Sequence, residues 1–387
     1  MNWPVVALGE VAEIERGGVA PERIETGTEY LGLEHIESGG EIVSRQTVEA
    51  GELASTKFVF DSRHLLYGKL RPYLAKIALP DFEGVCSTDI LPVMPGRNLD
   101  RRYLAYFLRQ PSMVEFARNR STGANLPRLS PKELAQFSIP LPPLKEQKRI
   151  AGILDQAAQL CRFRTRALDT LNTLGQAIFH EMFVANSSPD WPTVPIEQIT
   201  DNMRTGPFGS QLLHSEFVEK GIPVLGIDNA VSNEFRWAKE RYISSEKYEQ
   251  LKRYTVLPGD VLVTIMGTCG RCAVVPEDIP TAINTKHLCC LTLDQERVDP
   301  YFLQAALLSH PNVLRQLGIE AKGAVMPGMN MGIIKALKVP LPPVELQHNY
   351  AGRLGVIKKS RSQAQIANQA IETLFASLQH RAFRGEL

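Results

Sequence analysis

Polar and basic residues gather in segments bounded by glycine and proline in this 387-residue sequence. Arg and Lys can hold phosphates or address guanine with two hydrogen bonds, Asn can read adenine, and Ser or Thr can do either less selectively. The candidates in the first half are Lys69, Arg71, Tyr73, Lys76, Ser87, Thr88, Arg118, Arg120, Asn125 and Arg128. Those in the second half are Arg204, Ser210, Gln211, His214, Arg271, Asn284, Lys286, His287, Lys322 and Asn330. Any one of them is equally well explained as a solvated loop residue, but the set favours a surface that binds DNA.

Motifs that carry catalysis are missing from the sequence. It has no phosphate-binding Walker loop, no Gly-x-Gly-x-x-Gly loop, no His-Glu-x-x-His helix, no Gly-x-Ser-x-Gly elbow and no Asn-Pro-Pro-aromatic segment. A nuclease using Asp81, Glu83 and Lys76 stays open as an alternative, although their order and spacing fit no metal-nuclease pattern well. The sequence therefore predicts a protein that is not an enzyme.

The cysteines are weak candidates for a metal site. Cys269 and Cys272 have metal-ligand spacing, but Cys289 and Cys290 are adjacent and suit a shared tetrahedral site poorly. All of them lie in or beside runs that read as strands. We expect thiols of the core or loops and no bound metal.

Composition describes an ordinary soluble chain with 44% hydrophobic and 22% charged residues. No apolar run approaches a membrane span, and the amino terminus lacks the pattern of a signal peptide, so we expect a cytoplasmic protein with reduced thiols. The formal net charge of +1 gives no support for nucleic-acid binding. A positive field, if present, must be local or shared with partners.

The two halves of the sequence repeat one another. Ile139-Pro-Leu-Pro-Pro-Leu144 returns as Val339-Pro-Leu-Pro-Pro-Val344, and Trp3-Pro4 returns as Trp191-Pro192. Tyr103 and its apolar run are matched to Tyr301 and its own. The offset between matching segments grows from 188 to 200. A duplicated unit with unequal loop insertions behaves in this way.

A long helix is predicted after each proline pair, because proline bars its predecessor from the α region and allows a helix to begin only afterwards. Apolar residues then alternate at steps of four and three, which is a heptad pattern. The predicted pairing residues are Ile150, Leu154, Leu168, Leu171, Ile178, Leu354, Ile357, Ile371, Phe375 and Leu378. Helices of roughly 37 residues would each reach about 55 Å, and we expect them to pair antiparallel as a coiled coil. The alternative is that each helix packs only on its own domain.

The predicted fold class is α+β, with two similar mixed domains that each feed a long helix. The expected division is 1–144, helix 145–183, linker 184–190, second domain 191–344, and helix with tail 345–387. We expect a strand over Tyr30–Ile36 and single helices over Leu99–Asn119 and Pro300–Gln316.

Several segments resemble those of a known family, the specificity subunits of type I restriction-modification enzymes. They are Tyr30-Leu-Gly-Leu-Glu-His-Ile-Glu-Ser38, Tyr67-Gly-Lys-Leu-Arg-Pro-Tyr-Leu74, Gly84-Val-Cys-Ser-Thr-Asp89, Ile139-Pro-Leu-Pro-Pro-Leu-Lys-Glu-Gln147 and Phe383-Arg-Gly-Glu-Leu387. The resemblance implies two target-recognition domains that each read one part of a split DNA site. It also implies two methyltransferase subunits and two restriction or translocase subunits as partners. S-adenosylmethionine, ATP and Mg are then expected on those partners, and no cofactor on this chain.

The second half departs from the first at the loops. Gly68-Lys-Leu-Arg71 is matched by Met266-Gly-Thr-Cys-Gly270, and Ser87-Thr88-Asp89 by Asn284-Thr285-Lys286. We therefore expect the two domains to read different half-sites. A single-chain DNA-modifying enzyme or nuclease with an unrecognised site, and a scaffold that makes no DNA contact, remain as alternatives.

Overall fold

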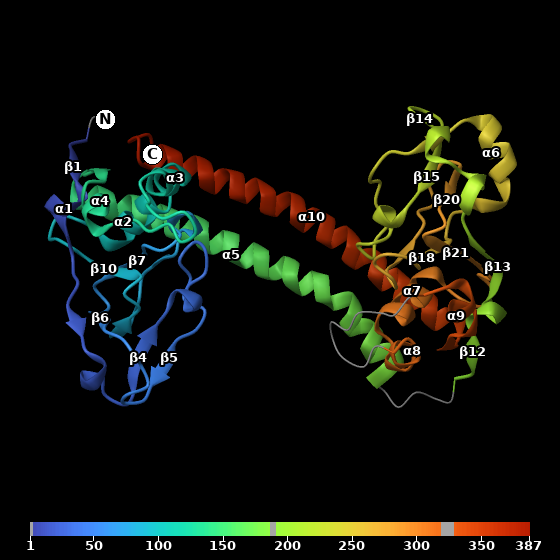
Figure 1. The fold of residues 1–387 in the computed structure, drawn as a ribbon, viewed down its shortest axis with the longest axis horizontal. Helices are drawn as coiled ribbons and strands as arrows, with labels where there is room; N and C mark the ends of the chain where they lie inside the picture. Colours follow the sequence, from blue (N-terminus) through green and yellow to red (C-terminus); the bar gives the residue numbers. More distant parts are fainter. Residues whose placement is uncertain (1–2, 186–190, 319–328) are drawn as a thin grey trace. The chain divides into compact units, whose positions relative to one another are not determined.

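The computed structural model of the chain describes residues 3–185, 191–318 and 329–387. The chain forms two compact units (Figure 1). The first unit takes the residues up to Arg166 together with Gln365–Leu387, and the second takes Ala167–Ala364. This division cuts across both long helices, so the five-part division drawn from the sequence stays a prediction. The predicted fold class, two mixed α+β units with long helices that run antiparallel, is confirmed.

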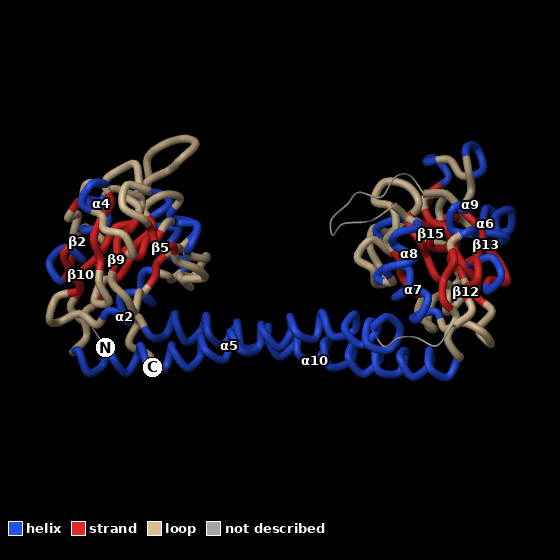
Figure 2. The backbone as a smooth tube through the Cα atoms, turned by 90° about the horizontal axis from the view of Figure 1, so that it is seen from below, coloured by secondary structure: helices blue, strands red, loops and turns tan. Residues whose placement is uncertain are grey.

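Three sheets build the first unit (Figure 2). The four-stranded antiparallel sheet has the order β2 (Ala12–Ile14), β10 (Ile90–Pro95), β7 (Leu65–Gly68), β8 (Ile77–Ala78). The five-stranded sheet has the order β3 (Gly18–Val19), β6 (Lys57–Phe60), β9 (Gly84–Cys86), β4 (Thr28–Leu31), β5 (Gln46–Val48), and only its pair β4 and β9 is parallel. A ribbon of β1 (Val5–Ala7) and β11 (Ser138–Pro140) completes the set.

Strand β7 explains how these layers pack. Successive side chains of a strand point to opposite faces, and all four residues of β7 are buried. Leu65 and Tyr67 enter the core cluster that contains α2 (Arg101–Leu108), whereas Leu66 enters the cluster that contains Leu31 and Phe60 of the five-stranded sheet. The four-stranded sheet therefore lies between a helical layer and the other sheet.

Prolines break the helices that the sequence predicts as single. The predicted helix Leu99–Asn119 is two helices, α2 and α3 (Pro111–Asn119). Pro111 is the first residue of α3, where its missing N–H costs nothing, and the preceding Gln110 leaves the α region. The remaining helical segments of this unit are α1 (Leu8–Val11), α4 (Pro131–Ala135) and the turns η1 (Pro21–Arg23), η2 (Leu33–His35) and η3 (Pro72–Leu74).

The predicted strand Tyr30–Ile36 is also shorter than expected. Strand β4 ends at Leu31, and η2 follows directly. The N–H of Gly32 donates to Nδ1 of His35 over 3.0 Å, which turns the chain out of the sheet. A side chain that binds its own backbone in this way competes with the strand ladder.

The second unit repeats the sheets of the first. Its four-stranded sheet has the order β13 (Thr200–Thr205), β21 (Leu288–Leu293), β18 (Val261–Thr264), β19 (Cys272–Val274). Its five-stranded sheet has the order β14 (Phe217–Val218), β16 (Tyr242–Ile243), β15 (Ile222–Leu225), β20 (Ala282–Asn284), β17 (Thr255–Val256), again with one parallel pair, β15 and β20. The ribbon is β12 (Thr193–Pro195) with β22 (Lys338–Pro340).

The helices of the second unit also follow those of the first. Pro311 divides the predicted helix Pro300–Gln316 into α7 (Pro300–Ser309) and α8 (Pro311–Gln316). The other helical segments are α6 (Ser245–Leu251), α9 (Met331–Ala336) and the turns η5 (Ile196–Ile199), η6 (Gly209–Gln211), η7 (His214–Glu216), η8 (Ile227–Asn229) and η9 (Lys252–Tyr254). The main-chain plan is therefore duplicated, including its proline breaks.

The long helices are α5 (Leu144–His180), which continues in the π turn η4 (Glu181–Ala185), and α10 (Val344–Ala382). A buried glutamine fixes the start of each. Nε2 of Gln147 donates to the carbonyls of Pro142 and Asn98 over 2.8 Å, and its Oε1 accepts from the N–H of Asp100 over 2.8 Å. Gln347 makes the same three bonds at 2.7, 3.1 and 2.9 Å. Removing either amide would leave buried backbone groups unpaired.

Within the first unit, α5 and α10 run antiparallel. Nη2 of Arg149, near the start of α5, donates to the carbonyl of Leu387 over 3.1 Å. Ile150 and Leu154 share a core cluster with Phe375 and Leu378 of α10. This cluster also contains the aromatic residues of α2, so the helix pair packs on the sheet domain as well as on itself.

Within the second unit, the same two helices pack through aromatic residues. The ring of Phe179 on α5 lies 5.6 Å from that of Tyr350 on α10, and Phe183 lies 5.7 Å from it. A methyl of Leu354 lies so near Gly175 that an added Cβ would approach it to 3.0 Å. The missing side chain at Gly175 thus makes room for Leu354 between the two helices.

The predicted pairing residues lie on the less exposed side of both helices. Buried positions are Ile150, Leu154 and Ile357, and partly buried ones are Leu168, Leu171, Ile178, Leu354, Ile371, Phe375 and Leu378. Arg164, which interrupts the heptad pattern, is exposed. No helix in the part of the chain that the structure describes has the length and apolarity that a membrane span requires.

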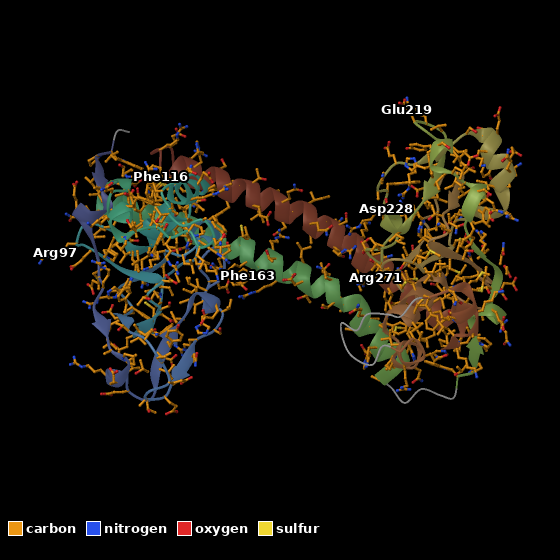
Figure 3. All side chains as sticks on the ribbon, in the orientation of Figure 1. Arg97, Phe116, Phe163, Glu219, Asp228 and Arg271 are labelled. Atoms are coloured by element: carbon orange, nitrogen blue, oxygen red, sulfur yellow. The ribbon has the colours of Figure 1, made fainter. Side chains whose placement is uncertain are left out.

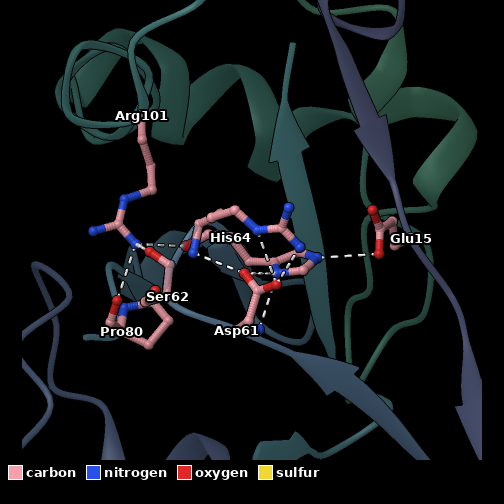
Figure 4. Close-up of polar contacts among 7 residues, drawn as sticks. Glu15, Asp61, Ser62, His64, Pro80 and Arg101 are labelled. Carbon is pink, nitrogen blue, oxygen red and sulfur yellow. Dashed lines mark hydrogen bonds and ion pairs between the residues drawn. The ribbon is translucent and has the colours of Figure 1, made fainter. Parts of the chain in front are cut away.

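One acid–base pair of the four-stranded sheet is arranged differently in the two units, and Figure 4 draws the pair of the first unit. In the first unit, Nε2 of His64 lies 3.1 Å from Oε2 of Glu15. Nδ1 of His64 accepts from the N–H of Asp61 over 3.0 Å and lies 3.1 Å from Oδ1 of the same residue, so the ring is held between Asp61 and Glu15. In the second unit the matching strand positions hold Arg204 and Asp260, whose Nη2 and Oδ2 lie 2.6 Å apart. The acid and the base have exchanged strands.

Candidate nucleic-acid interface

Backbone hydrogen bonds join three loops at one end of the first unit. Strands β7 and β10 are antiparallel, so the end of one and the start of the other meet. The N–H of Lys69 donates to the carbonyl of Asp89 over 2.9 Å, and the N–H of Leu129 donates to the carbonyl of Lys69 over 2.9 Å. The N–H of Arg71 donates to the carbonyl of Pro127 over 2.7 Å. Loops 68–76, 87–89 and 122–129 therefore form one surface, which we call the first loop junction.

Asp89 lies among the cations of this junction. Its Oδ1 and Oδ2 accept from Nε and Nη2 of Arg128 over 3.0 and 3.3 Å. Nζ of Lys69 lies 4.0 Å from Oδ1 of Asp89. The carboxylate thus holds two cations of loops that are far apart in sequence.

The turn η3 is held between two residues in the left-handed region. Arg71 has φ 50° and Ala75 has φ 48°, which costs a residue with a Cβ about 1–2 kcal/mol. The turn presents Tyr73, whose side chain is exposed, and Arg71 is exposed beside it. Such conformations persist where the surrounding structure enforces them and cluster at functional sites.

The other predicted residues of the first unit fall into two groups. Thr88, Arg118, Arg120 and Asn125 are exposed, and Ser87 and Lys76 are half-buried. Arg118 and Arg120 lie at the end of α3, which packs against η3, so they border the first loop junction. The guanidinium of Arg120 stacks 3.4 Å from the ring centre of Phe116. Nζ of Lys76, by contrast, donates to the carbonyl of Leu33 over 2.7 Å and is turned inward.

The second unit forms a corresponding junction. The N–H of Thr285 donates to the carbonyl of Leu225, and the N–H of Ile265 donates to the carbonyl of His287, both over 2.9 Å. A Cβ on Gly206 would lie 2.0 Å from the carbonyl oxygen of Asn284, so only glycine allows the approach of that loop. Loops 206–211, 226–229, 265–271 and 285–287 therefore meet at one surface, the second loop junction.

These bonds correct the alignment of the two halves. The carbonyl of Leu31 accepts from Ser87 in the first unit, as that of Leu225 accepts from Thr285 in the second. Asp89 is therefore matched by His287, not by Lys286 as the sequence suggests.

The aromatic match is also displaced by one residue. Asp100 caps α2 through the N–H groups of Arg102 and Tyr103, and Asp299 caps α7 through those of Tyr301 and Phe302. Tyr103 is thus matched by Phe302 and not by Tyr301.

Two predicted loop residues are wrong in their placement. Arg204 lies in β13 with its side chain 8% exposed, and it bonds to Asp260, Thr292 and the carbonyl of Thr255. Asn284 is fully buried at the end of β20, where its Nδ2 donates to the carbonyl of Leu288 over 3.0 Å. Both side chains point into the core and bond to groups there, although Nε of Arg204 and Oδ1 of Asn284 are buried without a hydrogen-bond partner.

The remaining residues of the second unit lie at or near its surface. Ser210, Gln211, His214, Arg271 and Asn330 are exposed, and Lys286 and His287 are half-buried. Arg271, labelled in Figure 3, lies on the loop between β18 and β19. Asn330 caps α9, since its Oδ1 accepts from the N–H of Ile333 over 3.0 Å. Lys322 lies outside the described residues.

Arg241 is a cation of this junction that sequence reasoning missed. Burial lowers the pKa of His287, and the charges of Lys286 and Arg241 lower it further. Arg241 is also paired with Asp228, which is labelled in Figure 3. The run of charged residues over 234–241 was the available sign. A neutral His287 between two cations can accept a hydrogen bond on one nitrogen and donate on the other.

The structure gives the alternative sites little support. Among the described residues, no three His, Cys, Asp or Glu side chains are grouped as metal ligands. Burial raises the pKa of the Cys289 thiol to about 12, and a protonated thiol is a poor ligand. Asp81 and Glu83 are exposed. Among the described contacts Lys76 pairs with neither carboxylate, and its Nζ donates to the carbonyl of Leu33 instead.

Comparison with protein families identifies a chain made of two DNA specificity domains. The model described as "Type I restriction modification DNA specificity domain" matches residues 1–172 and 190–372. The chain belongs to this family, the specificity subunits of type I restriction-modification systems. In this family the chain supplies DNA recognition and is not the catalytic component.

Curated relatives carry the same description. The chain is 29% identical over 195 residues to the type I restriction enzyme EcoDI specificity subunit of Escherichia coli, which covers 49% of this chain and 43% of that one. It is 22% identical over 402 residues to the MjaVIII specificity subunit of Methanocaldococcus jannaschii, covering 96% and 92%. The EcoDI match thus spans less than half of that relative's length.

Solved structures show the same fold. A chain from a structure of complex assembly and conformational transition of the type I R-M system has a TM-score of 0.64 at 21% identity, covering 100% of this chain and 98% of that one. The S subunit from M. genitalium has a TM-score of 0.61 at 15% identity, covering 99% and 96%. At these identities the likeness establishes the fold alone.

Proposed function

We propose that each unit reads one part of a bipartite, asymmetric DNA site through its loop junction. The observation that carries this proposal is the duplicated junction with unlike side chains. The same backbone bonds place Lys69 and Asp89 in one unit and Ile265 and His287 in the other. A constant scaffold with different donors and acceptors at matching points is suited to reading two different sequences.

The proposal includes partners that perform the chemistry. Two methyltransferase subunits and two restriction or translocase subunits would assemble on this chain, and they would bind S-adenosylmethionine, ATP and Mg. The long helices offer apolar surface outside their own pairing. In the first unit Leu160, Phe163, Ile366 and Leu374 are 44%, 55%, 70% and 53% exposed. Exposed apolar side chains along a helix suit contact with another protein.

Sequencing of methylated bases in cells that express the chain with its modification subunits tests the proposal. We expect one split motif with two unlike halves. The double variant Lys69→Ala/Arg71→Ala should weaken or relax only one half, and Arg271→Ala only the other. Loss of a base-reading arginine costs on the order of 1–3 kcal/mol at one position, whereas loss of a phosphate contact weakens all sequences alike.

The competing functions predict different results. A single-chain enzyme would methylate or cut DNA as the pure chain supplied with S-adenosylmethionine or magnesium. A scaffold would leave the motif unchanged in both variants. Either result contradicts the proposal, as does a variant in one unit that alters both halves of the motif.

A further inference from the structure

Stabilisation of the fold does not explain the ion pair of Asp89 with Arg128. Arg128 is 44% exposed and Asp89 is 25% exposed. Exposed pairs contribute little to stability. A carboxylate on a surface that binds DNA also repels phosphates. The carboxylate is therefore explained better by its effect on the positions of the cationic side chains around it.

Both partners of this pair are fixed by the backbone. The N–H of Asp89 donates to Oγ of Ser87 over 3.3 Å, and its carbonyl accepts from Lys69 over 2.9 Å. Arg128 exchanges two backbone hydrogen bonds with Thr122, at 2.9 and 3.1 Å. The guanidinium is thus held at its base by a strand-like bridge and along one edge by the carboxylate.

The edge of Arg128 that remains is chemically specific. A guanidinium has five N–H donors in one plane. Asp89 engages Nε and Nη2, which leaves the two N–H groups of Nη1 and the second of Nη2. The outer pair from Nη1 and Nη2 is parallel and matches two acceptors side by side. In the major groove guanine offers such a pair in O6 and N7, whereas adenine presents a donor beside N7.

We propose that Asp89 is a positioning residue that aims Arg128 at a guanine in the part of the DNA site read by the first unit. The inference rests on the proposed function and adds a base and a residue to it. Fixing the side chain before binding reduces the entropy lost when the complex forms. The second unit has His287 in place of Asp89 and Ile265 in place of Lys69, so it lacks this acid at the matching point.

The test uses the complex of the full chain with its modification subunits. The methylated motif is determined for the wild type, for Asp89→Asn, for Arg128→Lys and for the control Glu115→Gln. Glu115 also pairs with an arginine of the first unit, Arg118, but at an exposed helix end. The Arg271→Ala variant identifies the half read by the second unit, and therefore the half that belongs to the first.

We expect a guanine in the first unit's half. Asp89→Asn and Arg128→Lys should relax that same position by roughly 5- to 150-fold and leave the other half unchanged. Lysine keeps the charge but loses the planar two-pronged edge, so a phosphate contact would survive Arg128→Lys, whereas a guanine contact would lose part of its discrimination against other bases. Glu115→Gln should leave the motif unchanged. The complex with Asp89→Asn should bind unrelated DNA at least as well as the wild-type complex, because the substitution removes a negative charge from the surface.

Several outcomes would overturn the inference. These are a first half without guanine, relaxation at different positions in the two variants, or uniform weakening with no change in the motif. Since Arg128→Lys alters no buried group, it tests the guanine contact even if Asp89→Asn folds poorly. A wild-type complex that methylates no split motif would instead refute the proposed function itself, so the two failures are distinguishable.

Discussion

The buried pair of Arg204 and Asp260 makes a sharp prediction about the second unit. Their side chains are 8% and 1% exposed, and Nη2 and Oδ2 lie 2.6 Å apart. Oδ1 of Asp260 also accepts from the hydroxyl of Thr292 over 2.7 Å. Asp260→Asn removes the negative charge and leaves the guanidinium of Arg204 buried without a counter-ion. Breaking such a pair from one side costs about 3–5 kcal/mol.

Calorimetry of the full chain measures this loss. For a unit of this size, 1 kcal/mol corresponds to about 2–4 °C, so we expect the melting temperature of the second unit to fall by roughly 6–20 °C. Hydrogen exchange should show lost protection in β13 and β18, while the first unit keeps its own. Those strands lead into loops 206–211 and 265–271, so DNA readout by the second unit should weaken as well.

A thermodynamic cycle shows whether the pair itself is responsible. Arg204→Met removes the buried cation, so the double variant Arg204→Met/Asp260→Asn should cost at least about 1 kcal/mol less than the sum of the single variants. Asp228→Asn is the matched control, because its pair with Arg241 is more exposed and should be worth under about 1 kcal/mol. The reasoning is refuted if Asp260→Asn costs less than about 1 kcal/mol, which is the value of an exposed pair, or if the single effects add.

Three further predictions concern pH, backbone strain and the long helices. Burial lowers the pKa of His310, the N-cap of α8, so the unfolded chain binds a proton at a higher pH than the folded chain, and stability should fall as the pH drops below about 6.5. His310→Asn keeps a cap and should flatten the dependence of stability on pH, measured by urea unfolding between about pH 5 and 7.5. An unchanged slope in this variant would contradict the assignment to His310. Ala75→Gly should raise the free energy of unfolding by up to about 1 kcal/mol because its φ is 48°, whereas the control Ala78→Gly in buried β8 should lower it. One heptad inserted after Leu168 and one after Ile371 should lengthen the gap of the methylated motif by about three base pairs, while three residues in one helix alone should destabilise the chain; an unchanged gap in a folded, active variant would show that the helices do not set it.

The long helices are the part of the fold that the sequence predicts best. The proline pairs stop a strand and start a helix by local sterics, and the heptad pattern is read along one chain. The breaks at Pro111 and Pro311 were also accessible from local rules, since proline belongs at the first turn of a helix. Predicting one helix across each of them gave the apolar pattern too much weight.

The interface is harder to predict because its partners are distant in sequence. Arg204 reads as a loop cation until Asp260, 56 residues later, is found beside it in the core. Asp89 shows no function until it is placed between Lys69 and Arg128. The shift that matches Asp89 to His287 depends on a backbone bond between strands, which residue identity does not reveal.

The first unit combines residues from both ends of the chain, and this limits the order in which the chain can fold during synthesis. Phe375, Leu378 and Ala382 belong to its core, and Phe383 packs 5.1 Å from the ring centre of Tyr103. These residues are made after the whole second unit. At about 5–20 residues per second, the ribosome needs on the order of 10–40 s to cross the roughly 200 residues between the two parts of the first unit. During that time the first unit lacks part of its core, while the second unit can already fold. The first recognition domain is therefore the one most exposed to early chaperone binding. A truncation that removes the end of α10 takes away part of the core of this first domain.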